Sequence, residues 1–96
     1  MRIVGRDKLE AFCSRYADAR PWLAAWLYEV EGMAWNTPQE IRDRYAAASF
    51  LAGNVVIFNV RGNNYRLEVN VAFKTGIVTV LWIGTHRAYD RRNRRR

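Results

Sequence analysis

The chain has 96 residues, half of them hydrophobic and 14% aromatic, so we expect one domain over residues 1–96 with little room for a second. Lys and Arg number 16 against 9 Asp and Glu, and 14 of those 16 are arginine, which gives a net charge of +7. Arginine binds phosphate through paired hydrogen bonds, so polyanions are the expected partners. The single cysteine, Cys13, excludes an internal disulfide, and the lack of a Cys/His cluster in the sequence predicts neither a metal nor a cofactor.

Two features of the sequence argue against a membrane. Arg, Glu or Gly interrupts every apolar stretch well before the roughly 18 residues that predict a spanning helix. Residues 1–12 lack the apolar segment of a signal peptide. We therefore expect a protein of the reducing cytoplasm.

The first third of the chain predicts a short edge strand at Ile3 and Val4 and then two consecutive helices. An apolar stripe repeats at helical spacing from about residue 7 to 17. Pro21 suits the first turn of a second helix, and Gly32 is a plausible end for it. The two helices are expected to form a hairpin whose apolar residues are Leu9, Phe12, Cys13, Tyr16 and Ala17 in the first and Leu23, Trp26, Leu27 and Val30 in the second.

A capping box begins the next helix. Thr37 is the expected N-cap, Pro38 the first helical residue and Glu40 the partner at the third position, with the helix running to about Tyr45. Residues 46–53 are expected to be a connector from which Phe50 and Leu51 dip into the core. The tryptophans are expected to pack in the core rather than to stack on bases: Trp22, Trp26, Trp35 and Trp82.

From Asn54 onward the pattern changes from helix to strand. We expect strands at 55–60, 65–73 and 77–83, separated by hairpin turns at 61–64 and 74–76. Residues 77–83 are apolar on both faces, which is typical of a central or helix-covered strand. The sequence therefore predicts an α+β domain in which N-terminal helices pack on an antiparallel β-meander.

The hairpin turns determine which polar residues come together. A turn centred on Thr75 pairs Arg66 with Gly84 and Asn64 with His86, and a turn at 62–63 pairs Asn59 with Arg66. One end of the sheet then gathers a set of polar side chains from the strand ends and the first turn: Arg61, Asn63, Asn64, Arg66, Thr85 and His86. The arginine-rich segment leaves the sheet from the same end.

These groups suit the cleavage of RNA. An imidazole changes charge near neutral pH, guanidinium groups neutralise a phosphorane, and a phenol transfers a proton. RNA carries its own nucleophile, the 2′-hydroxyl, so a base, an acid and cations are sufficient. His86, Arg66 and Tyr89 are the candidates for these roles.

Two segments resemble the HigB-type toxins of bacterial toxin–antitoxin systems, within the RelE-like family of mRNA interferases. They are Val60-Arg-Gly-Asn-Asn-Tyr-Arg-Leu67 and Gly84-Thr-His-Arg-Ala-Tyr-Asp90. The resemblance implies helices packed on an antiparallel sheet and metal-independent cleavage of mRNA in the ribosomal A site. It also implies a helix-turn-helix antitoxin of the HigA type, through which alone the toxin would contact DNA.

By matched position, the resemblance implies that His86, Arg66 and Tyr89 are catalytic or contact phosphate. The expected RNA-binding residues are Arg61, Asn63, Arg87, Asp90, Arg91 and Arg92. Residues 91–96 match no motif of the family and are expected to be a flexible arginine-rich tail that adds phosphate contacts.

Simpler interpretations stay open for several of these residues. His86 could be a solvated histidine at a strand end, Arg66 could pair with Glu68, and Tyr89 could pack its ring on the sheet. Asp90 could orient a neighbour or cap a helix. For the whole chain, the alternative is a basic module that binds RNA or the ribosome without cleaving it.

Overall fold

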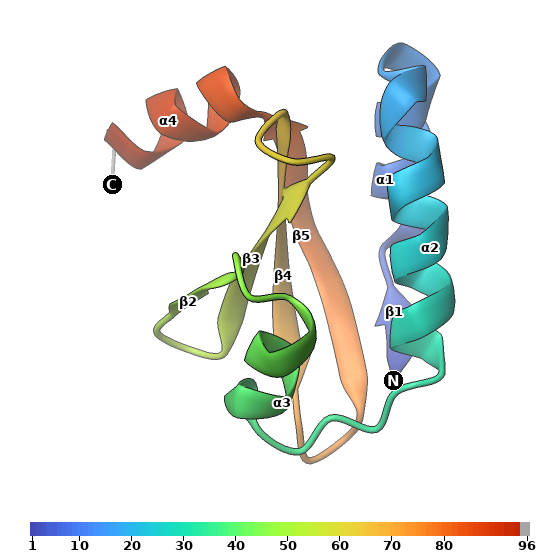
Figure 1. Ribbon diagram of the computed structural model, residues 1–96, viewed down its shortest axis with the longest axis vertical. Coiled ribbons are helices and arrows are strands. Elements are labelled where there is room, and N and C mark those ends of the chain that lie inside the picture. Colours follow the sequence, from blue (N-terminus) through green and yellow to red (C-terminus); the bar gives the residue numbers. More distant parts are fainter. Residues whose placement is uncertain (95–96) are drawn as a thin grey trace.

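The computed structural model describes residues 1–94, which form a five-stranded sheet in the order β1-β5-β4-β3-β2, with helices on both sides (Figure 1). Within those residues no helix is both long and apolar enough to span a membrane. The elements in chain order are β1 (Arg2–Val4), α1 (Arg6–Arg15), the 3-10 helix η1 (Ala17–Ala19), α2 (Arg20–Glu31), α3 (Pro38–Arg44), β2 (Ser49–Leu51), β3 (Val55–Val60), β4 (Tyr65–Ala72), β5 (Ile77–Thr85) and α4 (His86–Arg94).

The core lies between the sheet and the α1–α2 hairpin (Figure 1). The helical stripes are those predicted, except that Tyr16 is the C-cap of α1 and Ala17 lies in η1, where it is exposed. Cys13 is buried among them, as predicted. The principal core residues are Leu9, Phe12, Leu23, Trp26 and Val30 from the helices and Val56, Phe58, Val60, Leu67, Val69, Val71, Val78 and Val80 from the sheet.

The meander β3-β4-β5 and the edge strand β1 are confirmed, and two expectations about the sheet are wrong. β1 pairs with β5 in parallel, so the sheet is mixed rather than antiparallel throughout. The expected connector contains β2, which pairs antiparallel with β3. β2 has three residues, too few for an alternating pattern to be recognised; Phe50 packs against the core and Leu51 is exposed.

The first hairpin turn has the predicted centre. Gly62 adopts a φ of 67°, and Arg61 also takes a left-handed conformation, with a φ of 52°. Asn59 pairs with Arg66, and Arg66 pairs with Gly84, both as predicted. A β-bulge between Glu68 and Val69 interrupts the pairing of β4 with β5.

The C-terminal segment is where the sequence-based expectations fail most. Residues up to Arg94 form α4, so the expected flexible tail does not begin at Arg91; Arg95 and Arg96 lie outside the described residues. α4 lies on the side of the sheet opposite α1 and α2 (Figure 1). Trp82 is half-buried beneath α4, beside Tyr89 and Arg92, rather than in the core as expected.

Candidate functional site

Arg66 and His86 lie together at the end of the sheet where β5 passes into α4. The backbone N–H of His86 donates to the carbonyl of Asn64 at 3.0 Å, which continues the β4–β5 ladder into the first turn of the helix. Arg66 Nη2 is 3.1 Å from His86 Nδ1. The predicted convergence of a guanidinium and an imidazole is therefore present in the structure.

Both nitrogens of the His86 ring have partners. Nε2 is 2.9 Å from Asp90 Oδ2, and Nδ1 lies 3.1 Å from Arg66 Nη2 and 3.2 Å from the carbonyl oxygen of Asn63. A carboxylate can only accept, so these partners assign the proton of the neutral ring to Nε2 and leave the Nδ1 lone pair to accept from Arg66. When the ring gains a second proton, Nδ1–H can donate to the Asn63 carbonyl. Asp90 thus orients its neighbour, which was one of the simpler interpretations of this residue.

The turn before β4 holds the Arg66 guanidinium. Nη2 donates to the Asn63 side-chain oxygen at 2.7 Å, and Nη1 donates to the carbonyls of Asn63 and Tyr65 at 3.3 and 3.2 Å. Amide oxygens orient a guanidinium without neutralising its charge. The alternative pairing of Arg66 with Glu68 is wrong, because Glu68 pairs with Arg92, its Oε1 2.6 Å from Arg92 Nη1.

Two other predicted site residues are held elsewhere. The ring of Tyr89 packs against Trp82 with its centroid 6.0 Å away, as in the packing alternative for this residue. Arg61 Nη1 is 2.8 Å from Asp18 Oδ2 in η1, so its guanidinium is tied to the helical layer. Tyr65 also donates to Asp18, and this hydrogen bond raises the pKa of the Tyr65 phenol above its ordinary value.

The remaining expected RNA-binding arginines lie along α4. Arg87 and Arg91 are exposed and, with His86 and Asp90, line an open hollow of about 650 Å³. Arg92 turns toward the sheet and contacts Glu68 and the ring of Trp82. Sequence reasoning missed the importance of Glu68, which is buried although it alternates with Arg66 and Asn70 on what was read as a polar face.

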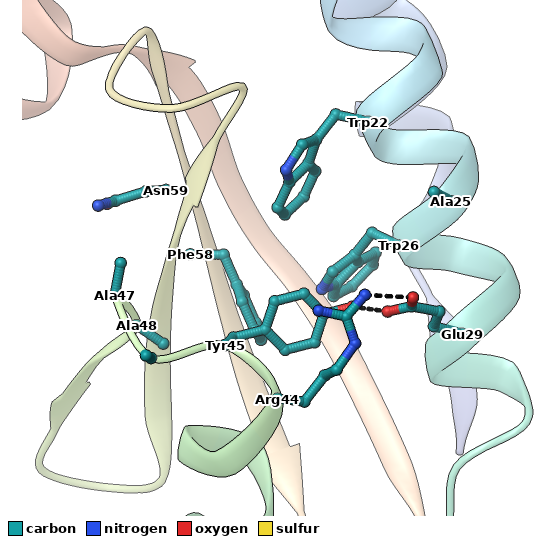
Figure 2. A pocket seen from close by; sticks show the side chains of 11 residues that line it. Trp22, Ala25, Trp26, Glu29, Arg44, Tyr45, Ala47, Ala48, Phe58 and Asn59 are labelled. Carbon is teal, nitrogen blue, oxygen red and sulfur yellow. Dashed lines mark hydrogen bonds and ion pairs between the residues drawn. The ribbon is translucent and has the colours of Figure 1, made fainter.

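A second hollow, of about 320 Å³, lies between α2 and β3 (Figure 2). Trp22, Tyr45 and Phe58 supply aromatic walls, and Glu29 accepts hydrogen bonds from the Tyr45 hydroxyl and the Arg44 guanidinium. These two bonds hold the pKa of Glu29 below its ordinary value. Among residues 1–94, no three His, Cys, Asp or Glu side chains gather as a metal ion would need.

Comparison with known proteins identifies the family of this chain. The family model of the HigB toxins, described as the RelE-like toxic component of a toxin–antitoxin system, matches residues 19–92, which include both Arg66 and His86. No curated protein sequence matches the chain. The match covers most of the 96 residues, and the five-stranded α+β architecture is consistent with a RelE-like fold. The chain belongs to the HigB family of RelE-like toxins, and its partner is an antitoxin.

Proposed function

We propose that this toxin is a metal-independent endoribonuclease of a type II system, which cleaves mRNA in the A site of the ribosome and so stops translation. The observation that carries the proposal is the contact between Arg66 and His86, 3.1 Å apart and both partly exposed to solvent. The antitoxin would be of the HigA type, with a helix-turn-helix domain that alone contacts DNA. The protein would act in the bacterial cytoplasm, bound to ribosomes.

The geometry at His86 favours a general base. Asp90 keeps the proton of the neutral ring on Nε2, so the Nδ1 lone pair is available once Arg66 turns away from it. A phosphodiester would draw the Arg66 guanidinium to its oxygens, because a charge-assisted bond to phosphate is stronger than a bond to a neutral imidazole. The 2′-oxygen would then attack phosphorus as its proton passes to Nδ1, while Arg66 neutralises the charge that develops on the phosphorane. The bond between phosphorus and the 5′-oxygen breaks, the 5′-oxygen takes a proton from water, and a 2′,3′-cyclic phosphate is left.

The charges on α4 supply the attraction for RNA. Arg87 and Arg91 are exposed beside His86, and neither forms an ion pair within residues 1–94. Arginines that neutralise phosphates release counterions, which makes binding sensitive to salt. These two residues would therefore contribute to affinity for RNA, with the chemistry left to Arg66 and His86.

The experiment that tests the proposal is mapping of 5′ ends of transcripts after induction in a growing culture. The parent is expected to arrest growth and create new 5′ ends inside reading frames, whereas His86→Ala and Arg66→Ala create none. Arg20→Ala, on α2 in the helical layer, is the control for loss of one arginine and is expected to behave as the parent. Ribosome binding without new 5′ ends would contradict the proposal and favour a non-catalytic basic module.

A further inference from the structure

α4, the helix that begins at His86, has few apolar residues with which to pack. Its sequence is His-Arg-Ala-Tyr-Asp-Arg-Arg-Asn-Arg, in which Ala88 and Tyr89 are the apolar members. So short a helix is marginal in water on its own, and two apolar side chains bury little surface. The position of α4 over the sheet therefore depends on specific polar contacts.

Arg92 makes the most buried of these contacts. Its Nη1 and Nη2 donate to the two carboxylate oxygens of Glu68 at 2.6 and 3.3 Å. Glu68 is 4% exposed, so its carboxylate lies away from bulk water in the middle of β4. Loss of Arg92 removes a hydrogen-bonded cation from a carboxylate that water reaches poorly, which is more costly than loss of a surface ion pair.

The ring of Trp82 is the surface against which Arg92 lies, and Gly84 makes room for that ring. Trp82 pairs with Glu68 across β4 and β5, and its ring centroid is 5.0 Å from the Arg92 guanidinium carbon. A Cβ at Gly84 would meet the Trp82 ring at 2.5 Å, so the glycine leaves room for the indole to lie along the strand. Together with Tyr89, which packs on Trp82, these contacts form a cluster that we call the α4 latch: Glu68, Trp82, Tyr89 and Arg92.

Arg92, the last residue of the latch along the chain, lies nearly two helical turns after His86, about 9 Å along the helix axis. The first turn of α4 has its own support, because Thr85 Oγ1 accepts from the backbone of Ala88 at 3.1 Å and His86 continues the sheet ladder. Asp90 lies between this first turn and Arg92, directly after Tyr89. Fraying of the helix from its C-terminal end would carry Asp90 away from the imidazole while His86 stayed in place.

We propose that Glu68 and Arg92 are positioning residues for the nuclease site. Their ion pair, in which the carboxylate is buried and the Arg92 side chain is 33% exposed, holds α4 against the sheet and thereby keeps Asp90 on the His86 imidazole. The effect on cleavage rests on the function proposed above, but the effect on α4 and on the imidazole does not. Arg92, expected from the sequence to bind RNA, acts here through Glu68 and Asp90.

The structural test compares Glu68→Gln, Arg92→Gln and the double variant by amide hydrogen exchange and by ¹⁵N NMR of His86. His86 is the single histidine of the chain, so its imidazole signals are unambiguous. Each single variant is expected to speed exchange of the last amides of α4 by at least about 10-fold. In mildly alkaline solution each should also mix the two neutral tautomers, which Asp90 holds as the Nε2–H form in the parent. Because the two residues act as one unit, the double variant should be no worse than either single one.

Arg20→Gln is the matched control, since Arg20 forms the same kind of pair with Glu10 at 2.9 Å in an exposed position. It should leave amide exchange in α4 and the tautomer of His86 unchanged.

If the single variants do not fold, Glu68→Met with Arg92→Met replaces the pair by apolar groups of similar size and should keep α4 docked. Unchanged exchange in the single variants, or effects that add in the double variant, would overturn the proposal.

The kcat and KM of mRNA cleavage on purified ribosomes distinguish a positioning role of Glu68 and Arg92 from direct binding of RNA by Arg92. The latch predicts that Glu68→Gln and Arg92→Gln each lower kcat by about 10-fold and leave KM unchanged, since both act through Asp90. If Arg92 instead contacts RNA directly, Arg92→Gln should raise KM. Glu68→Gln should then lower KM, because it releases the arginine for RNA. That pair of results would overturn the proposed role of the latch. If the parent itself does not cleave, the proposed function fails, while exchange and NMR still decide the latch.

Discussion

Asp90 lies one helical turn after His86, and its carboxylate is close enough to fix the imidazole without neutralising Arg66. The two side chains of the pair are 51% and 39% exposed. A polar contact as exposed as this contributes little to the free energy of folding. Its contact with Nε2 therefore matters chiefly for the tautomer and orientation of the ring.

Asp90→Asn tests this role at the scale of one residue. Asparagine can present an N–H to Nε2 and so favour the other tautomer, which places a proton on the nitrogen that faces Arg66. The cleavage rate should fall by at least about 10-fold, while the free energy of unfolding changes by less than about 0.5 kcal/mol. The rate is measured on ribosome-bound mRNA and the stability by urea titration. Asp43→Asn, on the distant α3, is the control, and a parental rate for Asp90→Asn would refute the orienting role.

At the scale of the element, α3 depends on its cap because it has seven residues. The Thr37 hydroxyl accepts from the backbone of Glu40 at 3.4 Å, and Glu40 accepts from the backbone of Asn36 at 2.7 Å. This is the predicted capping box with one change, since Glu40 reaches the residue before the N-cap. Ile41 is fully buried in the core, so the cap also positions a core residue.

Thr37→Ala should therefore lower the free energy of unfolding by about 1 kcal/mol, because it leaves a backbone N–H of the first turn without its acceptor. Urea titration monitored by circular dichroism gives the value. Thr75→Ala, in the exposed turn before β5, removes a comparable hydroxyl with a hydrogen bond of 3.5 Å and should change stability by less than about 0.5 kcal/mol. Equal losses from both substitutions would show that the cap has no special importance.

The sheet register shows why part of the site was predictable from sequence. Hairpin turns at glycine positions predict which residues of neighbouring strands pair. The sequence alone therefore predicts that Arg66 and His86 lie close together. The turn at 74–76 is not centred on Thr75, however, because Ala72 pairs with Ile77. Opposite Glu68 and Val69, β5 contains one extra residue, Leu81, which forms the β-bulge. This extra residue shifts the pairing by one, so that Arg66 faces Gly84 as predicted, although the sequence does not predict the bulge.

Other elements depend on contacts distant in the sequence. The parallel pairing of β1 with β5 joins the two ends of the domain, and three residues carry no signal for strand direction. The pairing of Glu68 with Arg92 is equally non-local. The sequence therefore predicts a flexible tail that binds phosphate from Arg91 onward, whereas Arg92 is bound to a buried carboxylate. Local patterns predict helices and hairpins, whereas partners of this kind require the folded chain.

Across the whole molecule, Glu29 joins α2 to the last residue of α3, Arg44, and to Tyr45, which follows it (Figure 2). Its bonds to Tyr45 and Arg44 lower the pKa of Glu29 from the ordinary value of 4.5, and burial raises the pKa of Tyr45. A carboxyl group whose pKa is lower in the folded state than in the unfolded chain stabilises the fold. Its contribution is fully present at pH values above the pKa of the unfolded chain. That contribution is lost as the pH falls through the lower folded value.

Glu29→Gln should therefore be less stable than the parent at pH 7, and the difference should shrink as the pH falls below about 4.5. Free energies of unfolding from urea titrations across this range give both curves. The comparison isolates Glu29, because Glu10, whose pKa is also lowered, is present in both proteins. If the difference in free energy of unfolding between the two proteins does not change with pH, the lowered pKa of Glu29 is not its cause, and lost packing is.

The central claim is that one imidazole and one guanidinium act together on an RNA phosphodiester. The most direct measurement is the rate at which purified toxin cleaves ribosome-bound mRNA, compared between the parent and His86→Ala. The rate is expected to fall by at least about 100-fold, the lower end of what a general base contributes, with ribosome binding and the free energy of unfolding preserved. A folded His86→Ala toxin that cleaves at close to the parental rate would contradict it.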